Sequence, residues 1–265
     1  SLTFRATFGY TSYGEENNYF QNTFKASVDQ ITTKSLTKSI VTNRTIMNAY
    51  TLAYDRTIAQ KHNVNALIGY EQYRNLYNAL FTSETDVGGN NYAYISTSNS
   101  VLNIRNGGFD PYGLVKSVFG RVNYDFSKKY FLSVSYREDA NYTVFGPGNQ
   151  KGRFPGTYVG WRISEEPFFK NSLPVVNSLK LRGSYGELGN SRIGNYRFLS
   201  TYDAINAQNF TPGGGAILNY TQNSLANADV KWETVQEANM GLDGEVMNGK
   251  FFFSFDWYNK KTVDM

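Results

Sequence analysis

Residues 118–137 read VFGRVNYDFSKKYFLSVSYR, and apolar and polar side chains alternate along both halves of this stretch. Because successive side chains of a strand point to opposite faces of its sheet, each half predicts a strand with one apolar and one polar face. The short connection from Ser127 to Lys129 predicts an antiparallel hairpin. In this hairpin the apolar face pairs Tyr124 with Leu132, Val122 with Val134, and Gly120 with Tyr136.

A second hairpin is predicted over residues 236–260, around the turn Asn248-Gly249. Both turn positions tolerate a positive φ, so this dipeptide is a strong hairpin signal that sets the register. One face then pairs Val246 with Phe251, Gly244 with Phe253, Leu242 with Phe255, and Met240 with Trp257. The other face pairs Gly241 with Asp256, Asn239 with Tyr258, and Glu237 with Lys260. Two distant hairpins thus show the same division into an apolar and a polar face.

Nine alternating segments are predicted in all, and short and long connections follow one another between them. The segments lie at about 1–10, 43–55, 62–80, 114–126, 129–138, 156–163, 177–187, 231–246 and 250–262. The connections are long at 11–42, 81–113, 139–155 and 188–230, and shorter at 56–61, 127–128, 164–176 and 248–249. Long loops at one end and short turns at the other are typical of outer-membrane β-barrels. We therefore expect an all-β fold, a transmembrane antiparallel β-barrel of which this chain forms about nine strands.

The number of strands indicates that residues 1–265 are part of one larger barrel domain. Single-chain bacterial barrels have even numbers of strands, and an open sheet edge is not tolerated in hydrocarbon. No secretion signal begins at Ser1, and Val263-Asp264-Met265 directly follows a segment that still needs a returning strand. We expect the C-terminal strands of the barrel to be absent from this sequence.

The composition agrees with this class of protein. The mean hydropathy is -0.47 and no run of about 20 apolar residues exists, which excludes membrane-spanning helices. Aromatic residues make up 16% of the chain, with 21 Tyr and 19 Phe, a content typical of barrel walls and of the aromatic belts at membrane interfaces. A half-buried sheet of a soluble protein would also alternate, so a secreted β-protein remains an alternative for any one strand.

Most chemistry based on cysteine or histidine is excluded by composition. The chain has no cysteine, which removes disulfides, thiolate metal sites and cysteine nucleophiles. The single histidine, His62, follows Lys61 at the start of a strand and is expected to be a solvated turn residue. The formal charge of +4 is spread along the chain, so no nucleic-acid partner is expected.

Catalytic and metal motifs are also missing. Gly213-Gly214-Gly215 is not followed by the Gly-Lys-Ser/Thr of a phosphate-binding loop. Glu165 and Glu166 are adjacent and should point apart on an extended chain, and the run 86–91 fits no calcium-loop spacing. We expect no enzyme activity, no catalytic residue, no cofactor and no metal.

The polar face is expected to line the lumen of the barrel. The charged residues expected there are Arg5, Arg121, Arg137, Arg162, Lys180 and Arg182, with Asp125, Glu237, Asp243 and Asp256 as acidic partners. Such residues serve either as a charge network that stabilises the inner wall or as contacts for a substrate.

The loops 81–113 and 188–230 are long and are rich in aromatic residues. These are Tyr92, Tyr94, Phe109, Tyr112, Tyr202, Phe210 and Tyr220. Long loops without regular structure are usually functional or disordered, and this density of aromatic residues argues against plain disorder. Because exposed aromatic residues supply much of the energy of protein interfaces and stack on sugars, we expect these extracellular loops to contact a partner protein or cargo.

Four stretches resemble the SusC/RagA family of TonB-linked outer-membrane proteins. They read FGRVNYDFSKKYFLSVSYRED (119–139), FGPGNQKGRFPGTYVGWRISEEPFFKN (145–171), LKLRGSYGELGNSRIGNY (179–196) and WETVQEANMGLDGEVMNGKFFFSFDWYNKKT (232–262). Residues 43–80 are similar to the preceding part of such barrels. One departure follows Arg137, where the family often has Asp-Gly-Ser-Ser-Arg and this chain has Glu138-Asp139-Ala140-Asn141-Tyr142.

The resemblance implies a barrel of about twenty-two strands in the outer membrane of a Gram-negative, Bacteroidetes-type bacterium, closed by a plug domain that this sequence does not include. It also implies active import of oligosaccharides or peptides, with energy reaching the plug through TonB and a SusD-like surface lipoprotein as a lid. Outer-membrane lipid would surround the wall. Two alternatives stay open: a passive or substrate-specific porin, and a secreted soluble β-protein or adhesin that buries its apolar faces.

Overall fold

The computed structural model describes residues 1–25, 30–31, 34–85, 103–207 and 217–263, with side chains over 1–23, 34–80, 113–202 and 221–263. The strands are β1 (Leu2–Gln21), β2 (Phe24–Lys25), β3 (Gln30–Ile31), β4 (Ser35–Ile58), β5 (His62–Thr85), β6 (Asn103–Phe126), β7 (Tyr130–Asn141), β8 (Lys151–Arg162), β9 (Val176–Asn190), β10 (Thr201–Ala207), β11 (Ile217–Ser224), β12 (Glu233–Val246) and β13 (Phe251–Val263). A 3-10 helix, η1 (Ile163–Glu165), and a short α-helix, α1 (Pro167–Ser172), join β8 to β9.

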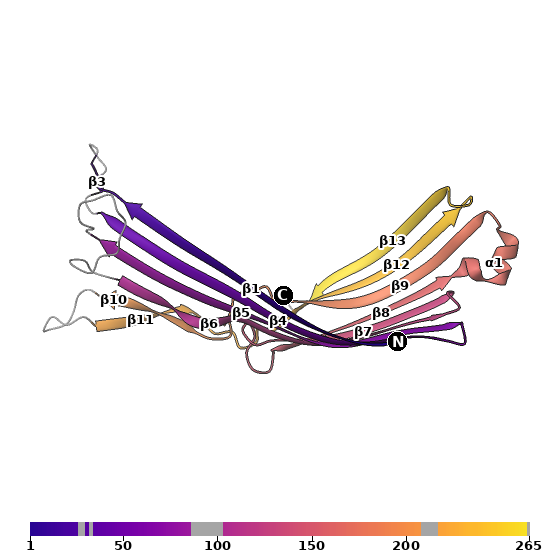
Figure 1. Cartoon of the computed structure of the whole chain (residues 1–265), viewed down its shortest axis with the longest axis horizontal. Helices are drawn as coiled ribbons and strands as arrows, with labels where there is room; N and C mark the ends of the chain where they lie inside the picture. Colours follow the sequence, from indigo (N-terminus) through magenta and orange to yellow (C-terminus); the bar gives the residue numbers. More distant parts are fainter. Residues whose placement is uncertain (26–29, 32–33, 86–102, 208–216, 264–265) are drawn as a thin grey trace. The chain divides into compact units, whose positions relative to one another are not determined.

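Nine of the strands form one sheet in the order β1-β4-β5-β6-β7-β8-β9-β12-β13 (Figure 1). Strands that follow one another along the chain are neighbours in this order, apart from the short pairs β2–β3 and β10–β11, which make small sheets of their own. Every strand pairing with a determined register is antiparallel. The fold is the expected all-β meander, a part of a transmembrane barrel. No helix in the described part of the chain is long and apolar enough to cross a membrane.

The chain divides into two compact units. The first consists of residues 1–7, 48–72 and 114–265, and the second of residues 8–47 and 73–113. In the second unit, Leu36 and Ala79 are buried and Lys38 pairs with Glu16 at 2.5 Å. The sites described below all lie in the first unit.

Both predicted hairpins have the predicted register. Strand β6 pairs with β7 so that Tyr124 faces Leu132 and Val122 faces Val134, and β12 pairs with β13 so that Leu242 faces Phe255. At the second turn Asn248 and Gly249 have φ values of 55° and 82°, the backbone conformation that this dipeptide favours. The spacing of the turn residues was therefore sufficient to specify the pairing.

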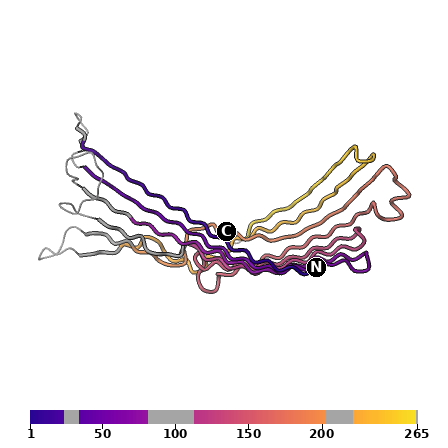
Figure 2. Tube along the Cα trace, viewed as in Figure 1, coloured from indigo at the N-terminus to yellow at the C-terminus, as the bar shows by residue number. Residues whose placement is uncertain are grey.

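The short turns of the first unit lie together at one end, called here the turn end (Figure 2). It consists of residues 59–61, 127–129, 163–175 and 247–250. Backbone hydrogen bonds join neighbouring turns: the amide of Ser127 donates to Lys61, that of Arg162 to Lys129, and that of Met247 to Val175. The opposite end, called the loop end, carries the connections 142–150, 191–200 and 225–232.

Several strands are longer than the sequence predicts. Strand β1 continues to Gln21, β4 begins at Ser35, and β6 begins at Asn103, so much of the expected loops 11–42 and 81–113 is strand. The expected loop 188–230 contains the hairpin β10–β11, in which Tyr202 pairs with Gln222. In β1 the stretch after Tyr10 is mostly polar on both faces, so its side chains show no apolar period to mark a strand.

The apolar face of the first unit is the exposed one. Along β7, residues Tyr130, Leu132, Val134 and Tyr136 are each more exposed than the residues between them, and β8 shows the same alternation. Val134 is 49% exposed and Phe255 66%. A soluble sheet would bury these side chains against a second layer, whereas a sheet in a membrane presents them to lipid.

Candidate functional site

Arg182 is the centre of a charged cluster on the polar face. Its guanidinium donates to Asp243 at 3.0 and 3.2 Å and to Asp256 at 2.6 and 2.7 Å. It also donates to Asn239 and Ser254, each at 3.3 Å. The planar guanidinium can bridge two carboxylates in this way, whereas a lysine ammonium has no such fork. The cluster joins β9, β12 and β13 across one face of the sheet.

The position opposite Arg182 is a glycine. Gly241 pairs with Arg182 in the register of β9 and β12, and a Cβ atom at this position would overlap the guanidinium. The absence of a side chain at 241 therefore allows Arg182 to lie across the backbone of β12 and reach β13. With all its partners inside the wall, Arg182 has the contacts of a structural residue.

Arg137 also has partners within the wall. Its Nε donates to Asp139 at 2.7 and 3.0 Å, one of its terminal nitrogens donates to Ser117 at 2.9 Å, and its guanidinium lies over the Phe119 ring at 5.4 Å. These contacts connect β6 and β7 on the same face as Arg182.

Arg162 and Lys180 both lie over the ring of Phe131. The distances to its centroid are 5.5 Å from the Arg162 guanidinium and 4.4 Å from Lys180 Nζ, and Lys180 also lies 5.5 Å from the Tyr158 ring. The two cations face each other in the register of β8 and β9. Cation–π contacts on a shared ring offset part of the repulsion expected of such a pair.

The remaining inner-face candidates make fewer contacts. Glu237 pairs with Lys260 in the register, as predicted, but within the described residues no ion pair joins their side chains. Arg121 faces Ser135 and is exposed, and Arg5 is exposed on β1. Their assignment to a lumen surface stays a prediction, as does any contact between these residues and cargo.

A ladder of hydrogen-bonded polar side chains that ends on a carboxylate crosses the same face, and the sequence did not point to it. Ser133 Oγ donates to Asn123 at 2.7 Å, Asn123 donates to Asn65 at 3.2 Å, and Asn65 donates to Asp55 at 3.3 Å. Every bond runs in one direction, towards the Asp55 carboxylate. Hydrogen bonds that follow one another in this way strengthen each other. The ladder links four strands, β7, β6, β5 and β4.

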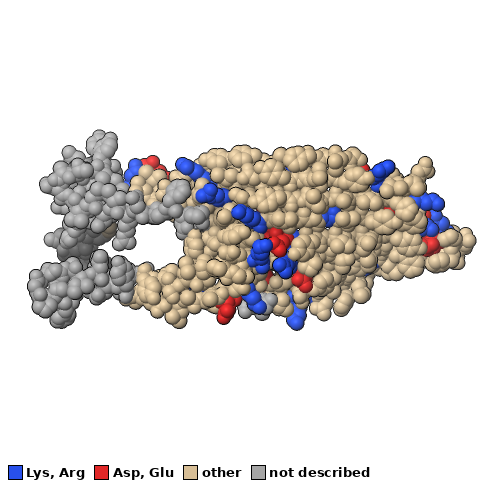
Figure 3. Space-filling view, turned by 90° about the horizontal axis from the view of Figure 1, so that it is seen from below, with Lys and Arg blue, Asp and Glu red and all other residues tan. Residues whose placement is uncertain are grey.

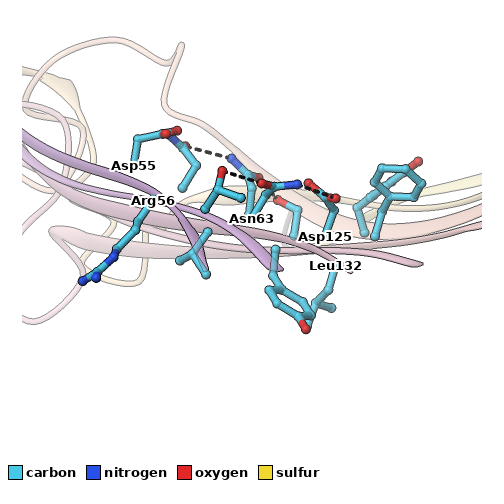
Figure 4. A pocket seen from close by; sticks show the side chains of 13 residues that line it. Asp55, Arg56, Asn63, Asp125 and Leu132 are labelled. Carbon is cyan, nitrogen blue, oxygen red and sulfur yellow. Dashed lines mark hydrogen bonds between the residues drawn. The ribbon is translucent and has the colours of Figure 1, made fainter. Parts of the chain in front are cut away.

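A second row lies beside the ladder, nearer the turn end. Thr57 donates to Asn63 at 2.7 Å and Asn63 donates to Asp125 at 3.0 Å, so the expected acidic partner Asp125 is held by an amide rather than by a cation. Figure 4 shows Arg56 extending away from these side chains. The two rows line a hollow of about 380 Å³ on the sheet. Side-chain amides donate and accept hydrogen bonds and carboxylates accept them, so this hollow is suited to polar molecules.

The loops at the loop end are held by a small aromatic core. Phe145 is fully buried and Trp232 is 8% exposed, and they pack with Val144 and Phe154. The Trp232 ring lies 5.0 Å from Phe145 and 5.5 Å from Phe154, and its Nε1 donates to the carbonyl of Gln150 at 3.0 Å. This is the one hydrophobic cluster of buried residues found in the described part of the chain.

Asn141 organises the backbone next to this aromatic core. Its side-chain oxygen accepts from the backbone amides of Thr143 and Val144, each at 3.1 Å, and its backbone amide donates to the carbonyl of Gln150 at 2.9 Å. The amide of Tyr196 donates to Thr143, which joins the connection 191–200 to 142–150. Asn followed by a turn was the only signal in the sequence that could have indicated this arrangement.

Comparison with known proteins relates the whole chain to outer-membrane receptors. A TonB-dependent receptor of Formosa agariphila is 31% identical over the full chain, and the TonB-dependent receptor SusC of Bacteroides thetaiotaomicron is 33% identical over 56% of it. The chain belongs to the SusC/RagA family of TonB-linked outer-membrane proteins. It spans about a quarter of the length of the first of these relatives, 25%, and 15% of SusC. No family model matches the chain.

The fold agrees with solved structures of this family. The structure of the RagAB peptide transporter superposes on the whole chain with a TM-score of 0.81 at 23% identity, and the match covers 28% of that chain. A second structure, of the RagAB peptide importer in a state called closed-closed, gives 0.80. The curated relatives are named as receptors rather than as enzymes.

The expectation that His62 is a solvated turn residue was wrong. His62 Nδ1 lies 2.8 Å from the Tyr124 hydroxyl, and the ring packs against Phe126 at 4.8 Å. Phe126 in turn stacks on Tyr130 at 6.4 Å. These rings form an aromatic row near the turn end, and outer-membrane barrels in general carry aromatic girdles at the membrane interface.

Glu165 and Glu166 have separate partners, as expected. Lys170 donates to Glu165 at 2.7 Å, and this hydrogen bond lowers the pKa of that carboxyl despite partial burial. Glu166 accepts from the Tyr130 hydroxyl at 2.6 Å and from Trp161 Nε1 at 3.2 Å, and these two bonds lower its pKa. Both carboxylates stay charged at neutral pH and hold α1 and the turn end in place.

The aromatic candidates of the long loops are only partly covered by the structure. Tyr202 is exposed on β10. Three more candidates have a described backbone but no described side chain: Phe109 and Tyr112 lie in β6, and Tyr220 lies in β11. Tyr92, Tyr94 and Phe210 lie wholly outside the described residues. Within the described residues no group of three His, Cys, Asp or Glu side chains could hold a metal ion.

Proposed function

We propose that the protein to which this chain belongs is an active importer of the outer membrane, driven through TonB, that takes up oligosaccharides or peptides. The chain would supply part of the barrel wall in a Bacteroidetes-type bacterium. The observation that carries this proposal is the similarity of the whole chain to TonB-dependent receptors, together with an apolar face that is exposed along the sheet.

The distribution of side chains on the two faces supports the role of a wall. Exposed apolar residues such as Val134 and Phe255 face lipid in this proposal, and the Arg182 cluster and the Asn ladder face the lumen. Because the inner-face cations Arg137 and Arg182 are paired within the wall, selection of cargo would depend more on the loops than on these residues. The cargo named for the RagAB structure is peptide, which supports peptides as one candidate class.

Dependence of uptake on TonB tests the proposal directly. Cells that carry the full-length protein should take up labelled oligopeptides or oligosaccharides, and deletion of TonB should abolish this uptake even when the barrel remains in the outer membrane. A passive porin would continue to pass the same compounds without TonB. Uptake that is unchanged by loss of TonB would therefore contradict active import and support the porin alternative.

We further propose that the hairpin β10–β11 contacts a SusD-like surface lipoprotein. The hairpin pairs Ala204 with Tyr220 and forms a two-stranded sheet separate from the nine-stranded one, with Tyr202 exposed on β10. A strand pair that projects from the loop end in this way offers surface to a lid, and exposed aromatic residues supply much of the energy of protein interfaces.

Deletion of residues 205–222 should weaken co-purification of the lipoprotein at least several-fold and leave the barrel folded, as judged by a heat-dependent shift on gels. Replacement of the same residues by a glycine-serine linker of equal length is the matched control for loop length, and should weaken the complex equally. If the complex stays intact and uptake is lost, the hairpin contacts cargo instead. If neither changes, the hairpin has no part in either function.

A further inference from the structure

A charged cluster lies on the apolar face of the sheet, at the loop end. It consists of Lys116 on β6, Glu138 on β7, and Lys151 and Arg153 on β8. Lys116 shares a face with Val118 and Val122, and the register places Glu138 between Val118 and Arg153 on its two neighbouring strands. These four side chains therefore continue the rows of apolar residues that face outward, rather than the charged rows of the inner wall.

One carboxylate serves two of the three cations. Lys151 Nζ lies 2.8 Å and Arg153 Nε 3.2 Å from the carboxylate of Glu138. The side chain of Arg153 is 69% exposed and that of Glu138 only 25%. Lys116 Nζ lies 5.4 Å above the ring of Tyr142, which is itself exposed. The cluster thus carries an excess of positive charge, and Lys151 and Arg153 are more exposed than the carboxylate they share.

The distance from the turn end places this cluster at the far boundary of the apolar band. On β6 the outward side chains begin with Phe126 at the turn, and Lys116 lies about ten residues further along. At about 3.3 Å per residue and a strand tilt of about 35–45°, this corresponds to roughly 25 Å across the membrane, the usual height of the apolar band of a barrel. Figure 3 shows Lys and Arg, with a few Asp and Glu among them, near the middle of the visible face, and a surface with few charges between them and the turn end.

The next carboxylate along this boundary is held by other groups. Glu187 on β9 accepts from the Tyr185 hydroxyl at 2.7 Å and from Gln236 at 3.1 Å. It does not pair with Lys151 or Arg153, so the positive charge of the cluster is not neutralised from that side.

We propose that Lys116, Lys151 and Arg153 bind a phosphate on the headgroup of a lipid in the outer leaflet. This inference rests on the proposed outer-membrane placement. An occupant of this surface meets apolar side chains such as Val118 on one side and three cations on the other, which is the environment that fits an amphiphile with an anionic head. Arg and Lys both bind phosphate oxygens, and basic residues next to a membrane attract anionic lipids. A soluble protein partner would have to occupy the lipid-covered face and fits this position poorly.

The test measures the lipid that stays bound to the full-length protein after purification in mild detergent. Replacing Lys116, Lys151 and Arg153 together by Gln should reduce retained lipopolysaccharide at least about fivefold. Replacing Lys61, Lys128 and Lys250 by Gln removes the same charge at the turn end and should leave retention unchanged. Equal retention in both triple variants would overturn the proposal.

Two further measurements make the test specific for phosphate. Glu138→Gln frees Lys151 and Arg153 from their carboxylate and should increase retention, whereas a decrease would contradict the assignment. Added lipid A should bind the purified protein in native mass spectra, and its chemically dephosphorylated form should bind several-fold more weakly. Equal binding of the two forms would mean that the acyl chains alone are recognised.

The proposed placement is tested separately from the proposed lipid site. An epitope tag inserted at Gly148 should be reached by antibody on intact cells, and a tag at Asn248 should not. If both tags are inaccessible or the orientation is reversed, the placement fails. If the tags behave as expected and lipid retention is unaffected by the triple variant, only the lipid site fails.

Discussion

Replacing Val134 with arginine should destabilise the folded protein in a lipid bilayer by about 2–4 kcal/mol. Val134 lies near the middle of β7, is half exposed, and pairs with Val122 on one side and Thr157 on the other. In the proposed membrane this side chain faces hydrocarbon, where a guanidinium loses its hydration without gaining a partner. Urea titration of the full-length barrel refolded into vesicles measures the change.

The matched control introduces the same charge on the other face. Ser184→Arg on β9 should change stability by less than about 1 kcal/mol, because Ser184 faces Tyr158 and Asn239 on the polar side. Ser133 would be the obvious choice from sequence, but its hydroxyl donates to Asn123 in the polar ladder, so its loss has a cost of its own. A large loss for Ser184→Arg with none for Val134→Arg would show that the two faces are assigned the wrong way round.

Replacing Trp232 with alanine should destabilise the loop end by about 3–5 kcal/mol, the usual cost of removing a large aromatic side chain from a packed core. The change removes the contacts with Phe145 and Phe154 and leaves the carbonyl of Gln150 without its Nε1–H donor. Hydrogen exchange of the backbone amides of residues 143 and 144 measures the effect, because both amides are protected by the adjacent Asn141 side chain.

Two other substitutions serve as controls for Trp232→Ala. Trp232→Phe keeps most of the aromatic packing and loses only the hydrogen bond, so it should cost about 1–3 kcal/mol. Trp257→Ala removes an indole that is half exposed on β13 and should leave exchange at the loop end unchanged. If Trp232→Ala leaves these amides as protected as in the wild-type protein, the buried aromatic cluster does not hold the loops.

Strand pairing at the two hairpins could be predicted from sequence because both signals are local. The turn at 248–249 needs residues that accept a positive φ, and the period of two then specifies every pair from Val246–Phe251 to Glu237–Lys260. The same reasoning failed where the strands continue past the segments that alternate. In β1 after Tyr10, polar residues occupy both faces, so no contrast between the faces marks the strand.

The charged residues of the polar face separate what the period of two predicts from what it does not. The period of two placed Arg137 and Arg182 on one polar face, but their partners depend on neighbouring strands and on space. Arg182 reaches Asp256, two strands away, only because residue 241 is a glycine, and Asp125 is held by Asn63, which lies 62 residues earlier in the chain. Neither contact can be recognised from a pattern of neighbouring residues in the sequence.

The sequence by itself therefore determined the class of fold, the two faces and the hairpin registers, since each follows from alternation and turn chemistry within a few residues. Only the tertiary structure decided which side chains meet: the Asn ladder, the Arg182 cluster, and the packing of Phe145 on Trp232. In the sequence, β8, η1, α1, β9, β10 and β11 all lie between the two residues of the last pair. Contacts of this kind depend on the lateral order of strands and on the paths of the loops, which the periodicity of a single strand does not record.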